Sequence, residues 1–138
     1  MKRLQPKRGV VRAVDTNVLV RFLVADDARQ AKRARAAIEA GDIFIATTVL
    51  METEWVLRAA YDFDGEAVAR ALRGLAGLPG VRVEEPARLA QALDWMMKGM
   101  DFADALHLSR TEDCALFLSF DKDLAKRAPK GATAVEAP

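Results

Sequence analysis

The sequence has very few of the residues that most often carry covalent catalysis or soft-metal binding. Among 138 residues there is one cysteine, Cys114, and one histidine, His107. A lone cysteine cannot form an internal disulfide, and a zinc site or a Cys-His or Ser-His-Asp centre needs partners that are scarce here. We expect Cys114, which precedes an apolar run, to be a buried and inert thiol, and His107 to be structural or exposed.

The sequence also lacks a long apolar run. No stretch approaches the roughly 20 uninterrupted apolar residues of a membrane span, and the basic residues 1–9 contain no apolar signal segment. We therefore expect a cytoplasmic protein without membrane association. An apolar fraction of 51% over 138 residues suits one domain, so we expect a basic extension at 1–9 and a single domain over 10–138.

The net charge of +1 hides an uneven distribution of charge. Residues 1–35 contain ten lysines and arginines but only three aspartates, so the excess of acid lies downstream. A basic rim beside an acidic pocket suits a polyanionic partner. For residues 29–35 alone, a solvated helix face explains the basic residues equally well.

Apolar periodicity and turn residues predict strands that alternate with helices. The predicted strands are 10–14, 42–46, 81–83, 115–120 and 132–135, and the predicted helices are 17–25, 27–40, 47–60, 64–77, 86–98, 101–110 and 122–128. This alternation predicts an α/β fold, a three-layer α/β/α sandwich with a mainly parallel central sheet. Strands 10–14 and 115–120 are the most continuously apolar, so we expect both to be central and covered on both faces.

An aspartate follows each of these two apolar strands. Ligands of open α/β sheets bind beyond the carboxyl ends of the strands, so Asp15 and Asp121 should meet at one edge of the sheet. Each aspartate could instead cap the helix that follows it, and Asn17 is a further candidate cap beside Asp15.

Two glutamates in the helix at 47–60 have different surroundings. Val49, Val56 and Ala60 form the predicted apolar stripe, and Glu54 lies outside it as an exposed ion pair with Arg58. Glu52 lies at the margin of the stripe and has no basic neighbour. A partly buried carboxylate of this kind needs a remote partner or a metal ion.

Asp101 and Asp104 lie three residues apart at the start of the helix at 101–110. Asp101 could cap this helix, and an aspartate in the first turn is favoured by the helix dipole. For Asp101 the cap and the site role are equally open. Asp104 is the stronger candidate for a functional site.

Carboxylates gathered at one edge of a sheet would repel one another. Two unit charges about 4 Å apart repel by roughly 4 kcal/mol at an effective dielectric constant near 20, so a cation must bind or some groups must stay protonated. Mg²⁺ or Mn²⁺ suits an all-oxygen ligand set. Such ions generate a nucleophilic water and neutralise a phosphodiester, which indicates phosphodiester hydrolysis.

Five fragments occur in an order and spacing that resemble the PIN-domain family, and more narrowly the VapC-type ribonuclease toxins of toxin–antitoxin pairs. They are Val-Asp-Thr-Asn-Val-Leu at 14–19, Asp-Asp with Gln30 at 26–30, Val-Leu-Met-Glu-Thr-Glu-Trp-Val-Leu at 49–57, Asp-Phe-Ala-Asp-Ala-Leu at 101–106 and Phe-Asp-Lys-Asp-Leu at 120–124. The resemblance covers nearly the whole chain.

The resemblance implies a role for each matching residue. The acidic metal-binding quartet would be Asp15, Glu52, Asp104 and Asp121, supported by Thr16, Asn17, Asp101 and Ser119. It further implies a Mg²⁺- or Mn²⁺-dependent endoribonuclease that acts on single-stranded RNA, forms a homodimer and is inhibited by a cognate VapB-like antitoxin.

Two alternatives compete with this interpretation. A catalytically silent PIN-like module could bind RNA or a protein without cutting. A phosphotransfer domain or haloacid-dehalogenase-like phosphatase would also place an aspartate after the first strand. The phosphatase is disfavoured because Asn17 stands where its second aspartate would be.

Overall fold

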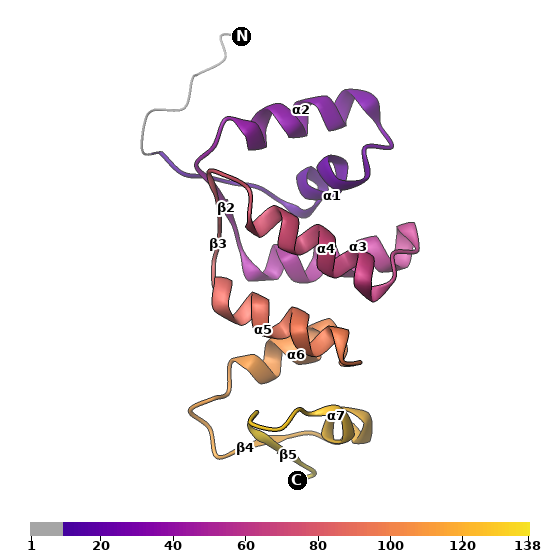
Figure 1. Cartoon of the computed structure of the whole chain (residues 1–138), viewed down its shortest axis with the longest axis vertical. Helices are drawn as coiled ribbons and strands as arrows, with labels where there is room; N and C mark the ends of the chain where they lie inside the picture. The colour runs from indigo at the N-terminus through magenta and orange to yellow at the C-terminus, as the bar shows by residue number, and fades with distance from the viewer. Residues whose placement is uncertain (1–9) are drawn as a thin grey trace.

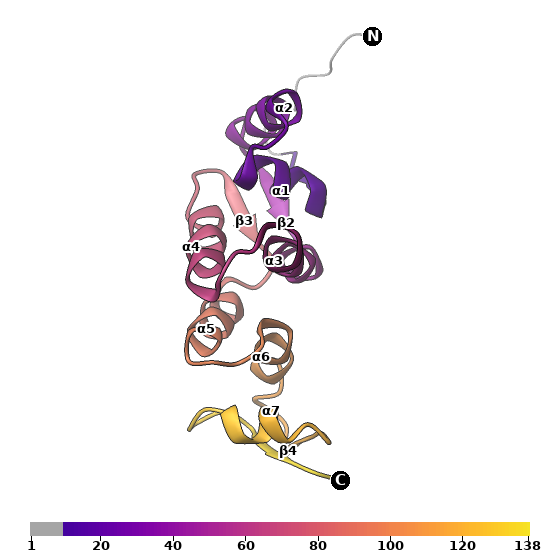
Figure 2. The ribbon, with the colours of Figure 1, turned by 90° about the vertical axis from the view of Figure 1, so that its right-hand side faces the viewer.

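The computed structural model describes residues 10–138. The basic extension predicted for residues 1–9 lies outside the described residues. The described chain is a mixed α/β protein whose strands pair in parallel, as predicted. It is elongated, with α1 and α2 toward one end and β4, α7 and β5 at the other (Figures 1 and 2).

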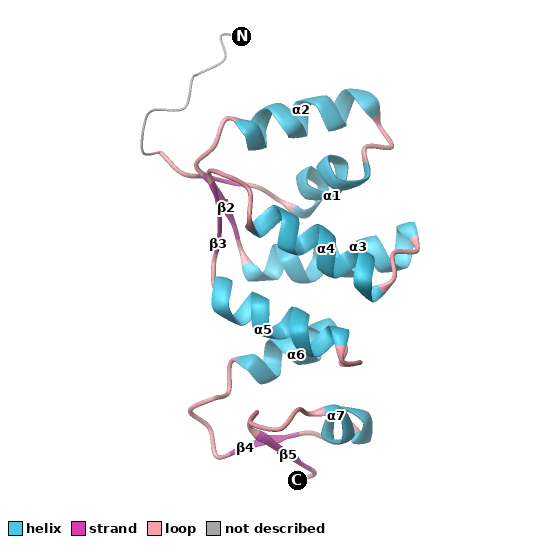
Figure 3. Ribbon diagram, viewed as in Figure 1, coloured by secondary structure: helices cyan, strands magenta, loops and turns pink. Residues whose placement is uncertain are grey.

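Each predicted helix and strand is present, and most bounds agree within two residues (Figure 3). The helices are α1 (Thr16–Val24), α2 (Ala28–Glu39), α3 (Thr47–Tyr61), α4 (Gly65–Ala76), α5 (Pro86–Met97), α6 (Phe102–Ser109) and α7 (Lys122–Arg127). The strands are β1 (Arg12–Ala13), β2 (Ile43–Ile45), β3 (Val81–Val83), β4 (Leu116–Leu118) and β5 (Ala134–Glu136).

Aspartates set the start of most helices. The residue before α1, α2, α4, α6 or α7 is an aspartate whose side chain accepts a hydrogen bond from a backbone N–H of the first turn. These bonds satisfy amide groups that have no partner inside the helix. Local sequence therefore fixes where the helices begin, which explains why their bounds are predictable.

The sheet differs from the prediction. Within residues 10–138 the strands form two separate parallel sheets, one in the order β1-β2-β3 and the other made of β4 and β5. The prediction that residues 10–14 and 115–120 form central strands is therefore wrong, because β1 and β4 are both edge strands. They are also poorly covered: Val11, Leu116 and Leu118 are exposed.

The main core lies between the β1-β2-β3 sheet and helices α1 to α6. Ile43 and Ile45 of β2 are buried there with Leu57 of α3, Leu72 of α4 and Phe102 of α6. From the C-terminal unit, which we define as β4, α7 and β5, Leu124 is buried in this cluster. Phe117 of β4 and Val135 of β5 are partly buried and pack against the same cluster.

The prediction for His107 is confirmed, whereas that for Cys114 is not. The sequence predicts His107 to be either structural or exposed, and it is exposed. Cys114 is exposed, so the expectation of a buried thiol is wrong. It lies in the turn before β4, and that turn is on the surface. Among the described residues, no helix is both long and apolar enough to cross a membrane.

Candidate functional site

The first part of the candidate site joins the start of α1 to α3. Asp15 is exposed and caps α1, because its Oδ1 accepts a hydrogen bond from the Val18 N–H at 3.1 Å. The next residue, Thr16, is buried and donates a hydrogen bond from its hydroxyl to Glu52 Oε1. Thr16 therefore holds the Glu52 carboxylate beside the end of β1. We call Asp15, Thr16 and Glu52 the first acidic group.

The burial of the two glutamates of α3 is the reverse of the prediction. Glu54 is buried, with 4% of its surface exposed, whereas Glu52 is exposed. The buried face of α3 runs through Leu50, Thr53, Glu54 and Leu57 and not through the predicted stripe. Polar residues can occupy that face because the polar atoms of each side chain have a partner. Thr53 donates to the Val49 carbonyl at 2.7 Å, and Glu54 pairs with Arg58 at 2.8 Å.

The second part of the site is a small hollow between α6 and α7. Asp101, Asp104, Asp121 and Asp123 line it, with a volume of about 220 Å³. Burial raises the pKa of Asp104 above its ordinary value, and the nearby charges of Asp101 and Asp121 raise it further, while His107 acts in the opposite direction. We call Asp101, Asp104 and Asp121 the second acidic group.

Hydrogen bonds orient the aspartates of the second acidic group. Asp101 caps α6 by accepting from the Asp104 N–H at 3.2 Å. Asp121 caps α7 by accepting from the Asp123 N–H at 2.9 Å, and its own N–H donates to Ser119 Oγ at 3.0 Å. Ser119 thus contacts Asp121 directly. Capping uses one carboxylate oxygen in each bond, so a cap and a ligand role are compatible for Asp15, Asp101 and Asp121.

The other supporting residue, Asn17, is exposed and directly follows Thr16. It lines a hollow of about 280 Å³ between α1 and α2, together with Arg21, Gln30 and Arg33. The helix cap that Asn17 could have supplied is supplied by Asp15.

Two further residues lie beside the second acidic group. Arg127 and Gly99 line the same hollow, and Arg127 Nη1 donates to the Gly99 carbonyl at 2.9 Å. Gly99 has a φ of 109°, and a Cβ there would lie 2.6 Å from Arg127 Nη1. The glycine that ends α5 is a sequence signal for this close approach.

The structure does not bring the two acidic groups together. Asp15 follows β1 and Asp121 follows β4, and these strands belong to different sheets. Within residues 10–138, no group of three or more aspartate, glutamate, histidine or cysteine side chains is placed to hold a metal ion. The carboxylates have the right chemistry for a hard cation, but in this arrangement they do not form a complete metal site.

Comparison with protein families matches residues 12–130 to the PIN domain. The match runs from β1 through α7 and therefore includes both acidic groups. No curated protein matches the chain. PIN domains are generally metal-dependent nucleases with an α/β/α fold. Because the match spans most of its length, the chain belongs to the PIN domain family.

Proposed function

We propose that the protein is a Mg²⁺- or Mn²⁺-dependent endoribonuclease and the toxin of a VapBC-type toxin–antitoxin pair. Its metal ligands would be Asp15, Glu52, Asp104 and Asp121. The observation that carries the proposal is the hollow beside α6, which Asp101, Asp104 and Asp121 line together. Such a gathering opposes folding through mutual repulsion, and a bound cation would remove that cost.

A divalent cation held by carboxylates lowers the pKa of bound water and offsets charge on a phosphodiester. In the single chain, the four proposed ligands lie in two separate groups. We therefore assign the activity to an arrangement in which the two acidic groups meet. The chain's own contributions are to orient Glu52 through Thr16 and Asp121 through Ser119.

Exposed basic residues suit an RNA partner. Arg29, Lys32, Arg33 and Arg35 lie on the exposed side of α2. Lys122, Lys126 and Arg127 lie on α7, beside the second acidic group. Phosphate contacts by such residues would position RNA without reading its sequence. We further propose a homodimer, a VapB-like antitoxin as the inhibitor and the cytoplasm as the location.

The second candidate function is a catalytically silent PIN-like module that binds RNA or protein. The separation of the two acidic groups favours it. A nuclease must bring those groups together, and a binding module need not.

The test is cleavage of total RNA by the wild-type protein and the Asp15→Asn variant, with Mg²⁺ or with excess chelator. Asp64→Asn is the matched control, because Asp64 is also an exposed helix cap and accepts from the Ala67 N–H at 2.8 Å. Asparagine is an equally good cap, so both variants should fold. We expect cleavage by the wild type and the Asp64→Asn variant, only with Mg²⁺.

Cleavage in chelator, or equal cleavage by the Asp15→Asn variant, would refute the metal mechanism. No cleavage by a folded protein, purified free of any antitoxin, would favour the silent module.

A further inference from the structure

In the part of the chain that the structure describes, β1, β3, β4 and β5 are edge strands, and of these only the β1 and β4 segments carry large exposed apolar side chains. In β1, the N–H groups of Arg12 and Val14 donate to the Asp42 and Phe44 carbonyls of the β2 side, at 2.8 and 3.4 Å. Because successive residues of a strand direct their backbone groups to opposite sides, those of Val11 and Ala13 face away from β2. An open row of this kind is a template for another strand.

The edge of β4 is open in the same way. β4 pairs with β5, and beyond it the Ser119 N–H donates to the Glu136 carbonyl at 3.0 Å. By the same alternation, the backbone groups of Leu118 face away from β5. The two open edges therefore offer the same spacing of donors and acceptors.

Apolar side chains are exposed along both open edges. Within residues 10–138, five of the seven large apolar side chains that are exposed belong to these two segments: Val10, Val11, Leu116, Leu118 and Phe120. Phe120 is 83% exposed and Leu118 59%. Such a concentration of exposed apolar surface marks a site of association.

A hollow beside β1 provides room for an added strand. Its volume is about 460 Å³. Apolar side chains of Ala13, Val14, Val18, Ala37 and Ile43 line it together with the charged residues Arg12 and Asp15. An added strand would cover the apolar part of this lining.

We propose that β4 of a second copy of this chain pairs in parallel with the open edge of β1, and that the exchange is reciprocal. Each copy would donate one β4 and accept another, which pairs the open edges of β1 and β4 on both copies under two-fold symmetry. The resulting sheet would have the order β3-β2-β1-β4-β5, with β4 and β5 from the second copy.

The contacts of the C-terminal unit favour a second copy over the chain's own β4. Thr133 Oγ1 donates to the Thr111 carbonyl at 2.6 Å, and Arg127 is bonded to Gly99, so the unit is tied to the segments that adjoin α5 and α6. In Figures 1 and 2 the C-terminal unit lies beyond α5 and α6, at the end of the molecule opposite α1 and α2. The chain's own β4 could reach β1 only by breaking these contacts, whereas a second copy can dock with them intact.

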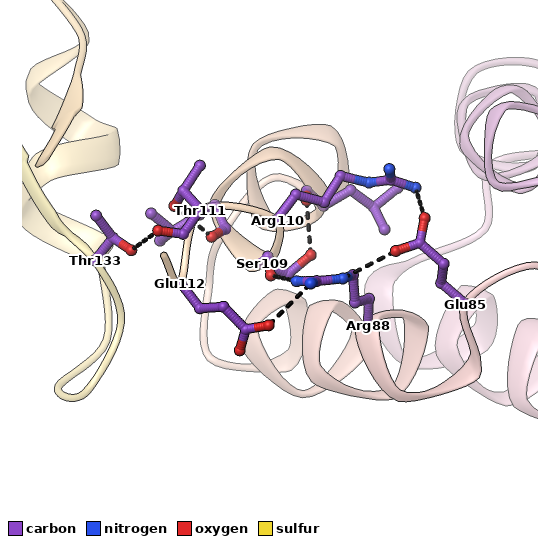
Figure 4. Close-up of polar contacts among 9 residues, drawn as sticks. Glu85, Arg88, Ser109, Arg110, Thr111, Glu112 and Thr133 are labelled. Atoms are coloured by element: carbon purple, nitrogen blue, oxygen red, sulfur yellow. Dashed lines mark hydrogen bonds and ion pairs between the residues drawn. The ribbon is translucent and has the colours of Figure 1, made fainter. Parts of the chain in front are cut away.

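A network around Arg88 fixes the segment that leads from α6 into β4 (Figure 4). Arg88 pairs with Glu85 and with Glu112, each at 2.9 Å, and donates to the Ser109 carbonyl. Arg110 pairs with the other oxygen of Glu85. These bonds hold the segment in the direction that carries β4 away from β1.

The exchange would also complete the candidate site. Asp15 follows β1 and Asp121 follows β4, and the carboxyl ends of paired parallel strands lie at one edge. Asp15 and Glu52 of one copy would then meet Asp104 and Asp121 of the other. This consequence rests on the proposed function, whereas the strand exchange itself does not.

The test uses single-cysteine variants in a Cys114→Ser background, one carrying Ala13→Cys and the other Leu118→Cys. The two variants are mixed, unfolded, refolded together and treated with a short bismaleimide. We expect a covalent dimer from the mixture and not from either variant alone. A chain carrying both cysteines should also give a covalent dimer.

Three results would overturn the proposal. A linked monomer from the double-cysteine chain would show that its own β4 pairs with β1. Linkage of either single variant to itself would indicate a different interface between the copies. A monomeric mass by light scattering, without linkage, would show that the edges of β1 and β4 stay unpaired in solution. The crosslinking assay does not measure RNA cleavage. It therefore tests the strand exchange even if the protein proves to have no nuclease activity.

A matched pair of substitutions provides a second measurement. Leu118→Lys adds a positive charge at the open edge of β4. Met97→Lys is the control, because Met97 of α5 is also an exposed apolar residue, with 49% of its surface exposed. Both variants should keep the wild-type circular dichroism spectrum. We expect a dimeric mass for Met97→Lys and a monomeric mass for Leu118→Lys, and equal masses would contradict the exchange.

Discussion

The Thr16 hydroxyl donates a hydrogen bond to the Glu52 carboxylate and so connects the first turn of α1 with α3. Thr16 is buried, whereas the Glu52 side chain reaches the surface. The bond therefore orients an exposed carboxylate from a fixed position. This geometry makes Thr16 a positioning residue for Glu52.

Replacing Thr16 with valine should test that role. Thr16→Val removes the donor while keeping the branched shape, and should cost about 1 kcal/mol in the free energy of unfolding. We expect RNA cleavage to fall by about fivefold, and Thr16→Ser to restore it, because a loss of about 1 kcal/mol corresponds to roughly that factor. Equal cleavage rates for the valine and serine variants would show that the Thr16 hydroxyl does not position Glu52 for cleavage.

The Glu54–Arg58 pair should matter for stability and not for cleavage. Arg58→Ala would leave the buried Glu54 carboxylate without its partner, at a cost of about 1–3 kcal/mol in the free energy of unfolding by urea. Replacing both residues with methionine should recover most of that loss, since well-packed apolar residues often equal an ion pair. A double variant as unstable as Arg58→Ala would show that Glu54 has other essential contacts.

The stability of the second acidic group should depend on pH. Because the pKa of Asp104 is raised in the folded state, the folded protein binds its proton more tightly than the unfolded chain does. The stability from this group is fully present below the unfolded pKa and is lost as the pH rises through the folded pKa. Asp104→Asn should therefore be more stable than the wild type at neutral pH.

The advantage of Asp104→Asn should disappear as the pH is lowered toward about 3, where the aspartate is protonated in both states. Urea unfolding across this range, without added metal, measures it. The exposed Asp113, changed to asparagine, is the control and should show no such trend. An advantage that persists at low pH would point to packing and not to charge.

Basic residues of α2 should contribute to RNA binding without sequence preference. Arg29→Ala with Arg33→Ala should weaken binding to every single-stranded RNA, and the salt dependence of log K should fall by about 0.7 for each phosphate that is no longer neutralised. Arg70→Ala with Arg82→Ala is the charge-matched control on α4 and β3. If the two double variants bind equally, net charge and not α2 governs binding.

The sequence predicts individual elements better than their assembly. Aspartate caps and the glycines and prolines that end helices act locally, so the helix bounds follow from them. The place of β1 and β4 depends on strand pairing between distant segments. Their apolar runs indicate that both need to be covered, but contain no information on what covers them. If the strand exchange is correct, the covering strand comes from another copy.

The sequence proposes candidate ligands but not their arrangement in space. Motif spacing points to Asp15, Glu52, Asp104 and Asp121, which the structure places in two groups. The error in burial between Glu52 and Glu54 has a local cause. The sequence predicts the Glu54–Arg58 ion pair, but hydropathy does not show that such a pair lets the glutamate lie on the buried face of the helix.

The most direct test of the account is complementation between Asp15→Asn and Asp121→Asn. Each variant alone should be inactive on RNA, because each lacks one ligand in both sites of the dimer. After the two are unfolded and refolded together, half of the dimers should be mixed and each should contain one intact site. We predict about a quarter of wild-type cleavage from the mixture, given random pairing. If the wild type cuts RNA and the mixture remains inactive, the site lies within one chain and the account is contradicted.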